Sequence, residues 1–131
     1  MQKSNTNTHT HTHTLTHTLF AFIILLLLPL ASQAHVHLDK SHPMKDQAMS
    51  SPPTAIQLWF SGKVEAEWSK VIVKDAHGQR VDNGDVTSIN NDAKTVQVNL
   101  KTLSAGKYDV TWNVVAGDGH RIKGGISFNV E

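Results

Sequence analysis

Alternation of apolar and polar residues is the dominant pattern after residue 54, and it predicts β-strands because successive side chains on a strand point to opposite faces. In residues 55–60 (AIQLWF) it places Ile56, Leu58 and Phe60 on one face. Residues 95–100 and 108–114 show the pattern most clearly, with a large apolar residue at every second position. The remaining alternating segments are residues 68–74, with Ser69, Val71 and Val73 on one side, residues 125–130, with Ile126, Phe128 and Val130 in register, and more weakly residues 81–89.

Turn residues separate these segments and complete the pattern of an all-β domain. Residues 75–78 (DAHG), 82–85 (DNGD) and 90–92 (NND) are typical of turns and hairpins. Residues 39–54 are polar, contain three of the four prolines and show no sustained period, so they are predicted to form a surface loop. The predicted fold is an immunoglobulin-like Greek-key β-sandwich or barrel of about seven strands. Trp112 is expected in its core.

The first 34 residues follow a different pattern, which predicts a cleavable signal peptide. Residues 1–18 are polar, residues 19–30 are almost wholly apolar, and residues 32–34 (SQA) offer small residues at the two positions that a signal peptidase recognises. The apolar run is shorter than the roughly 20 residues that span a bilayer, which makes a retained membrane anchor the weaker alternative. The histidines at positions 9, 11, 13 and 17 are interpreted as low-complexity leader sequence. Residues 35–131 then form one small exported domain.

The composition after residue 34 limits the classes of partner that the domain can bind and the types of ligand that a metal site can use. Lys3 is the only charged residue before position 35, so the rest of the chain carries equal numbers of basic and acidic residues. This balance is not typical of a nucleic-acid or membrane-surface binder. The chain has no cysteine, although an oxidising compartment favours disulfides in small domains. Stability must therefore come from packing, and a metal site must use nitrogen, oxygen or thioether ligands.

The predicted cleavage creates a metal chelator at the new terminus, His35. Its α-amine and its imidazole lie on one residue, so both can bind the same divalent ion, and copper suits such a pair of nitrogens. His37 is two residues away and faces the same side of an extended segment. Asp118 and His120 lie in a glycine-containing turn, whose backbone can aim both side chains at one point. Copper(II) prefers a tetragonal plane of nitrogen and oxygen donors, which the amine and ring of His35, the ring of His120 and a carboxylate oxygen of Asp118 would fill once the amine and imidazoles have lost their protons.

Simpler structural explanations exist for several of these residues. Asp118-Gly119 is a common turn dipeptide, so the turn by itself does not require a metal. His77 lies in a polar turn and is predicted to be solvated. His42, Met44 and Met49 form a looser set that could hold copper(I), whose softness favours sulfur, but two methionines five residues apart are a weak signal for a second site.

The residues around these candidates resemble the CopC family of small periplasmic copper-resistance and copper-homeostasis proteins. The most specific part of the pattern is Gly-x-Tyr-x-Val-x-Trp at 106–112, followed by Asp-Gly-His at 118–120. The similarity covers essentially all of residues 35–131, and its other parts are residues 35–38 (HVHL), 41–43 (SHP), 58–61 (LWFS), 64–65 (VE), 103–105 (LSA), 114–115 (VV), Gly124 and 127–130 (SFNV).

The resemblance implies both a fold and a ligand set. It implies a Greek-key β-sandwich that binds one copper(II) ion through an N-terminal histidine brace, formed by the amine and ring of His35 together with Asp118 and His120. His37 matches a second histidine of the family and is a further candidate ligand. Family members commonly carry an acid near the metal where this chain has Gly62, and losing such a carboxylate typically costs about tenfold in affinity. The methionine-rich copper(I) loop of some members is missing, because residues 54–115 contain no methionine.

The function that follows from the resemblance is non-enzymatic sequestration or delivery of copper(II) in the periplasm, with an inner-membrane transporter of the CopD type as a candidate partner. One alternative is a copper-dependent oxidase similar to lytic polysaccharide monooxygenases. A domain of this size offers little surface for a polymer, and a carboxylate in the copper plane disfavours the reduced ion. The other alternative is a metal-free immunoglobulin-like interaction module. The direction of copper transfer is left open.

Overall fold

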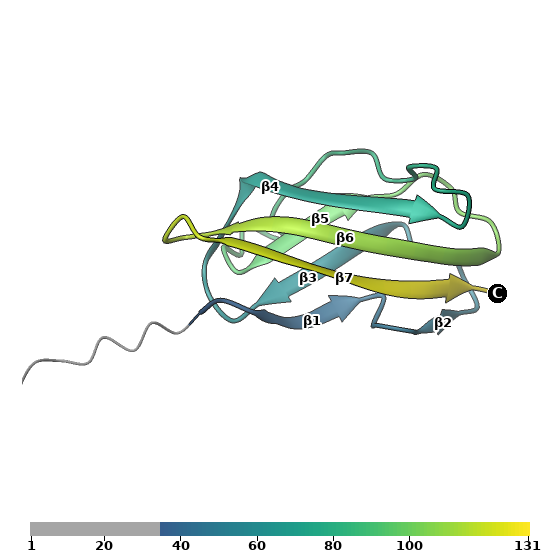
Figure 1. The fold of residues 1–131 in the computed structure, drawn as a ribbon, viewed down its shortest axis with the longest axis horizontal. Coiled ribbons are helices and arrows are strands. Elements are labelled where there is room, and N and C mark those ends of the chain that lie inside the picture. The colour runs from purple at the N-terminus through teal and green to yellow at the C-terminus, as the bar shows by residue number, and fades with distance from the viewer. Residues whose placement is uncertain (1–34) are drawn as a thin grey trace, which may run out of the picture. The chain divides into compact units, whose positions relative to one another are not determined.

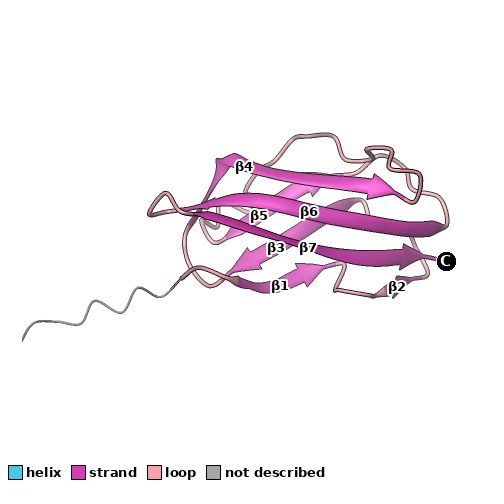
Figure 2. Ribbon diagram, in the orientation of Figure 1, coloured by secondary structure: helices cyan, strands magenta, loops and turns pink. Residues whose placement is uncertain are grey.

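The computed structural model describes residues 35–131, which form two β-sheets packed face to face (Figure 1). One sheet has three strands in the order β1-β3-β5, and the other has four in the order β2-β7-β6-β4. The strands are β1 (Leu38–His42), β2 (Ala48–Met49), β3 (Ala55–Phe60), β4 (Val64–Asp75), β5 (Thr95–Asn99), β6 (Gly106–Ala116) and β7 (Arg121–Val130). The predicted all-β sandwich of seven strands is thereby confirmed (Figure 2).

Two further points concern the predicted signal peptide and membrane-spanning helices. The signal peptide predicted at residues 1–34 lies outside the described residues. Within residues 35–131, the structure contains no helix that is long and apolar enough to cross a membrane.

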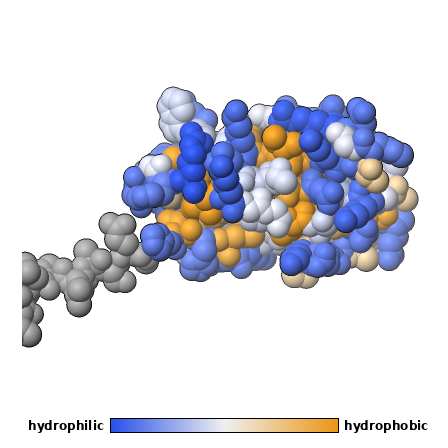
Figure 3. All heavy atoms as spheres, viewed as in Figure 1, coloured by the Kyte–Doolittle hydropathy of each residue, from blue (hydrophilic) through white to orange (hydrophobic). Residues whose placement is uncertain are grey.

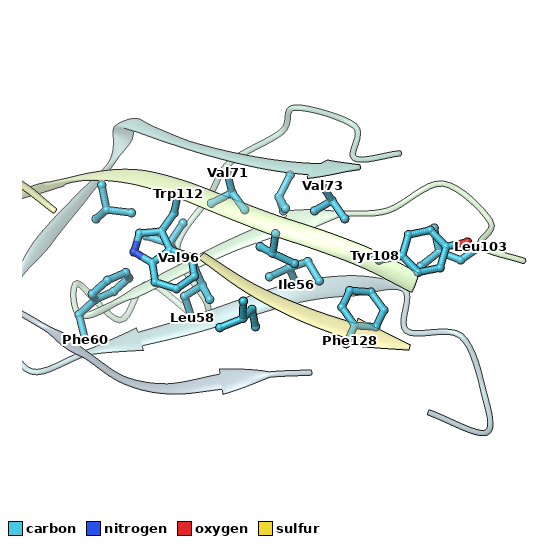
Figure 4. Close-up of a cluster of buried hydrophobic side chains, with 14 of the residues drawn as sticks. Ile56, Leu58, Phe60, Val71, Val73, Val96, Leu103, Tyr108, Trp112 and Phe128 are labelled. Atoms are coloured by element: carbon cyan, nitrogen blue, oxygen red, sulfur yellow. The ribbon is translucent and has the colours of Figure 1, made fainter. Parts of the chain in front are cut away.

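The core lies between the two sheets and consists of the inward-facing positions of the alternating strands (Figure 4). Ile56, Leu58 and Phe60 of β3 are buried, as the alternation predicts. Trp112 of β6 is 8% exposed, which confirms it as a core residue. Polar side chains predominate on the surface shown in Figure 3, with smaller apolar areas between them. Because the chain has no cysteine, burial of these apolar side chains is the main source of its stability.

The surface loop predicted for residues 39–54 is wrong in part, because the segment contains most of β1 and all of β2. β1 lies at the edge of its sheet and pairs only with β3, and Ser41 is the single buried residue of the strand. β2 is two residues long and pairs in parallel with the end of β7. Such short edge strands are held by backbone pairing, so no apolar alternation marks them in the sequence. Residues 81–89 form isolated bridges, Asp82 with Leu100 and Thr87 with Gln97, and no strand.

β4 begins earlier in the sequence than its alternation of apolar and polar residues indicates, because the strand contains a β-bulge. The pairing of β4 with β6 is interrupted between Glu65 and Lys70. The Ser69 hydroxyl bridges the interruption, donating to the Glu65 carbonyl at 2.6 Å and accepting from the Val115 amide at 3.1 Å. Trp68 is turned outward at the bulge and is 66% exposed. Because a bulge adds residues without losing the pairing beyond it, the second half of β4 keeps the predicted inward register.

A buried carboxylate, Asp82, organises the long connection between β4 and β5. It accepts hydrogen bonds from the Val73 amide at 2.8 Å, the Gly84 amide at 3.0 Å and the Arg80 guanidinium at 2.7 Å. Burial by itself would raise the pKa of Asp82, but the hydrogen bonds from Arg80 and from the two amides outweigh burial and lower that pKa. The ionised carboxylate therefore ties the connection to β4.

Replacing Asp82 tests this role. We expect Asp82→Asn to lower the free energy of unfolding by about 2 kcal/mol, because a charged acceptor of three donors is lost. Since folding lowers the pKa of Asp82, its contribution is complete above the pKa of an unfolded aspartate and is lost as the pH falls below about 4. Urea unfolding at several pH values should show the two proteins converging in acid. Glu67→Gln, which alters an exposed carboxylate of β4, serves as the control, and an equal loss in both variants would contradict the assignment.

Candidate metal centre

Two segments that carry predicted site residues meet a third segment at one end of the sandwich. The three segments are residues 35–37, the β3–β4 turn at residues 61–63 and the β6–β7 turn at residues 117–120. The Ser61 amide donates to the His37 carbonyl at 2.9 Å, and the Gly117 amide donates to the Lys63 carbonyl at 2.8 Å. The β3–β4 turn therefore connects the N-terminal segment to the β6–β7 turn. Figure 1 shows the start of the described chain and the β6–β7 turn at the same end of the molecule.

The β6–β7 turn brings Asp118 and His120 together. The Ala116 amide donates to the His120 carbonyl at 2.8 Å, and Gly119 has a φ of 87°, which suits glycine in a tight turn. Asp118 accepts a hydrogen bond from the His120 amide at 3.0 Å, and its second oxygen lies 3.0 Å from Nδ1 of the His120 ring. These two contacts with His120, the amide first, lower the pKa of Asp118.

The resulting pair is suited to binding a cation. Both side chains are more than half exposed, so an ion can approach from solvent. Asp118 stays ionised to a lower pH than an ordinary aspartate. In this conformation Nδ1 of His120 faces the carboxylate and Nε2 is directed away from it, so one of the two side chains must rotate for a single ion to bind both.

The N-terminal segment places His37 against Ser61 and Asp39. The His37 amide donates to the Ser61 hydroxyl oxygen at 3.0 Å, and Nδ1 of the ring lies 3.1 Å from the same oxygen and 3.3 Å from the His35 carbonyl. Nε2 lies 3.0 Å from a carboxylate oxygen of Asp39. Both ring nitrogens of His37 therefore have partners within the protein. Sequence reasoning missed Ser61 and Asp39 as partners of this histidine, although Ser61 belongs to the matched stretch at residues 58–61.

The structure does not assemble the whole predicted ligand set. Within residues 35–131, no three histidine or carboxylate side chains lie close enough together to hold a metal ion. The nitrogen of His35 is bonded to Ala34 in the full chain, so the amine that the predicted brace requires exists only after cleavage. Participation of His35, His37, Asp118 and His120 in one site stays a prediction.

Gly62 has a steric role that its sequence position did not reveal. A Cβ atom on this residue would lie 2.7 Å from Cγ2 of Val36, closer than real carbon atoms approach. Val36 is half-buried and packs against the core cluster. The glycine thus makes room for Val36, and the side chain of an acid at this position would collide with the N-terminal segment.

The remaining histidines and methionines do not form one group. His42 and Met49 line the same cavity of about 450 Å³, whereas Met44 is 59% exposed and does not line that cavity. His77 is exposed in the turn after β4, as predicted. That turn is at the opposite end of β4 from the β3–β4 turn.

The contact between Gly62 and Val36 predicts the behaviour of a matched pair of variants. We expect Gly62→Ala to push Val36 aside and to speed hydrogen exchange of the His37 amide about tenfold, because a strained segment opens more readily. The double variant Val36→Ala/Gly62→Ala, in which Cγ2 is absent, should exchange more slowly than Gly62→Ala alone. Exchange measured by nuclear magnetic resonance would contradict the steric role if the two variants behaved alike.

Comparison with known proteins identifies relatives of this chain. The sequence model of the CopC domain matches residues 38–131. The chain is 34% identical over 101 residues to the copper transport protein CutJ of Bacillus subtilis (strain 168), covering 76% of this chain but only 18% of CutJ. It is 32% identical over 99 residues to protein YobA of Escherichia coli (strain K12), covering 75% of this chain and 80% of YobA.

Solved structures show the same fold. CopC from Methylosinus trichosporium OB3b superimposes with a TM-score of 0.70 at 26% identity, covering 74% of this chain and 94% of that one. PcoC, a methionine-rich copper resistance protein from Escherichia coli, superimposes with a TM-score of 0.65 at 30% identity, covering 75% of this chain and 100% of that one. The family match extends through β1 to the end of β7, so the chain belongs to the CopC domain family.

Proposed function

We propose that this protein is exported, is cleaved after Ala34 and binds one copper(II) ion through a brace at its new N-terminus. The ligands are the amine and ring of His35, a carboxylate oxygen of Asp118 and the ring of His120. The observation that carries the proposal is the position of the Asp118–His120 turn at the end of the sandwich where residues 35–37 lie. Copper(II) favours this mixture of three nitrogens and one oxygen in a plane.

The relatives support copper as the cargo. CutJ is named a copper transport protein, and PcoC is described as a copper resistance protein. Because this chain spans about a fifth of CutJ, the transport activity of CutJ as a whole does not follow from the match. The role we propose is that of a copper-handling protein that carries or sequesters the ion and performs no reaction on it.

The location and partner follow from the same proposal. The predicted signal peptide directs the chain to the periplasm, where an inner-membrane transporter of the CopD type is the proposed recipient or donor of copper. The exposed Asp118–His120 pair suits such exchange, because a site near the surface can be reached by the ligands of a partner.

The brace tolerates the glycine at position 62. A carboxylate near the metal would help to orient the amine, and its absence lowers affinity without removing a ligand. Val36 packed against Gly62 instead holds the segment that carries His35. Packing of Val36 thus supports the N-terminal segment sterically, where a carboxylate would have supported the amine electrostatically.

Intact mass and electron paramagnetic resonance on the exported protein test the proposal. The mass should begin at His35, and one equivalent of copper(II) should give a tetragonal signal with nitrogen ligands. His120→Ala and an extra residue ahead of His35 should each weaken binding at least about 100-fold, since each removes a ligand from the plane. His77→Ala should leave the signal unchanged, because His77 lies at the opposite end of β4.

Two results would overturn the brace. One is a mature terminus other than His35. The other is a copper signal that is indifferent to the extension and to His120→Ala. The first result would favour a metal-free interaction module on the same sandwich, and the second would assign the copper to other ligands.

A further inference from the structure

The terminus that provides the brace also contains a second, competing chelator. With a free amine on His35, the tripeptide His35-Val36-His37 has a histidine in the third position. Such a terminus can bind copper(II) or nickel(II) in a plane of four nitrogens, namely the amine, the amide nitrogens of Val36 and His37, and Nδ1 of His37. Forming this chelate releases the two amide protons to solvent. Both modes need the same amine, so one excludes the other.

A single hydroxyl occupies both atoms that His37 would give to the four-nitrogen chelate. The Ser61 oxygen lies 3.0 Å from the His37 amide nitrogen and 3.1 Å from Nδ1 of its ring. A hydroxyl can accept from the amide and donate to the ring nitrogen at the same time. Both chelating atoms are therefore engaged by one side chain.

The contact with Asp39 indicates which nitrogen of the His37 ring carries the proton. A carboxylate oxygen of Asp39 is 3.0 Å from Nε2, and an ionised carboxylate only accepts. The Asp39 contact favours the tautomer with the proton on Nε2 over the longer 3.3 Å contact of Nδ1 with the His35 carbonyl, and in that tautomer the lone pair lies on Nδ1, next to the Ser61 hydroxyl. The lone pair that a metal would need is thus already used.

The backbone around His37 is held in addition to its ring. The Ser61 amide donates to the His37 carbonyl at 2.9 Å, directly before the strand pairing of Leu38 with Phe60. Val36 is packed over Gly62. To close a planar chelate, the segment must turn the Val36 and His37 amides toward one ion and give up the bonds to Ser61.

We propose that Ser61 determines which of the two copper-binding modes the terminus adopts. Its hydroxyl, with Asp39 behind the ring, holds His37 out of the four-nitrogen chelate and leaves the amine and ring of His35 for the site with Asp118 and His120. In this assignment His37 is a positioning residue and not a ligand. The inference rests on the proposed function for the cleaved terminus at His35.

Nickel(II) is the probe that tests this role. The four-nitrogen nickel complex is planar, diamagnetic and yellow, whereas nickel bound to mixed nitrogen and oxygen ligands is paramagnetic and pale. In exported protein that begins at His35, we expect Ser61→Ala to bind nickel in the yellow form about tenfold more tightly than the unchanged protein, since two hydrogen bonds no longer compete. Ser61→Thr, which keeps the hydroxyl, should behave like the unchanged protein. Adding His37→Ala to Ser61→Ala should abolish the yellow complex.

A second comparison uses a synthetic peptide and the unchanged protein, so it does not depend on the folding of a variant. A synthetic peptide with the sequence of residues 35–37 should form the yellow complex at a pH at which the unchanged protein does not. The proposal is overturned if the protein and the peptide take up nickel alike, or if Ser61→Ala binds no better than Ser61→Thr. These results are separate from the brace, because His120→Ala should alter the copper signal, whereas Ser61→Ala should bind nickel in the yellow form more tightly than Ser61→Thr whether or not His120 is present.

Discussion

The antiparallel ladder between β6 and β7 is the constraint on which the candidate site depends. It pairs continuously from Gly106 with Val130 to Val115 with Arg121, so the turn beyond it has a fixed position relative to the core. Near that turn the ring of Trp112 lies across Gly124, where a Cβ would come within 2.4 Å of Cζ2. The tryptophan therefore requires glycine at the paired position. Its indole nitrogen is buried without a hydrogen-bond partner among the described residues, which indicates that shape, and not polar bonding, places the ring.

The sequence predicts those strands that are both paired through their backbone and buried at every second position. β3, β5 and β6 have alternating buried positions, and their apolar residues revealed both the strands and the core. β1 and β2 lie at sheet edges, where backbone bonds alone define the strand, and their residues look like a loop. The bulge in β4 depends on one serine hydroxyl between two strands, and no local pattern predicts a contact between Ser69 and Val115.

The candidate site also has one part that could be predicted from the sequence and another that could not. Asp118 and His120 are two residues apart, so the turn that joins them could be predicted from their own sequence. The partners of His37 are harder to predict, because the contact with Ser61 spans 24 positions and arises from the pairing of β1 with β3. Gly62 illustrates the limit of reasoning from a missing side chain. The resemblance to the family implies a lost acid at this position, whereas the structure shows a space that Val36 occupies.

In the proposed site, chemistry also links copper binding to export. An amide nitrogen must lose its proton before it can bind a metal, whereas a free amine offers a lone pair, so the uncleaved bond between Ala34 and His35 withholds the donor that the brace uses. Removal of the leader would convert that nitrogen to an amine. The Asp118–His120 turn and the His37–Ser61 contact are present in the structure before the amine exists. In this proposal the sandwich already holds the Asp118–His120 turn and the terminal segment, and cleavage would supply the amine that restricts copper capture to the exported protein.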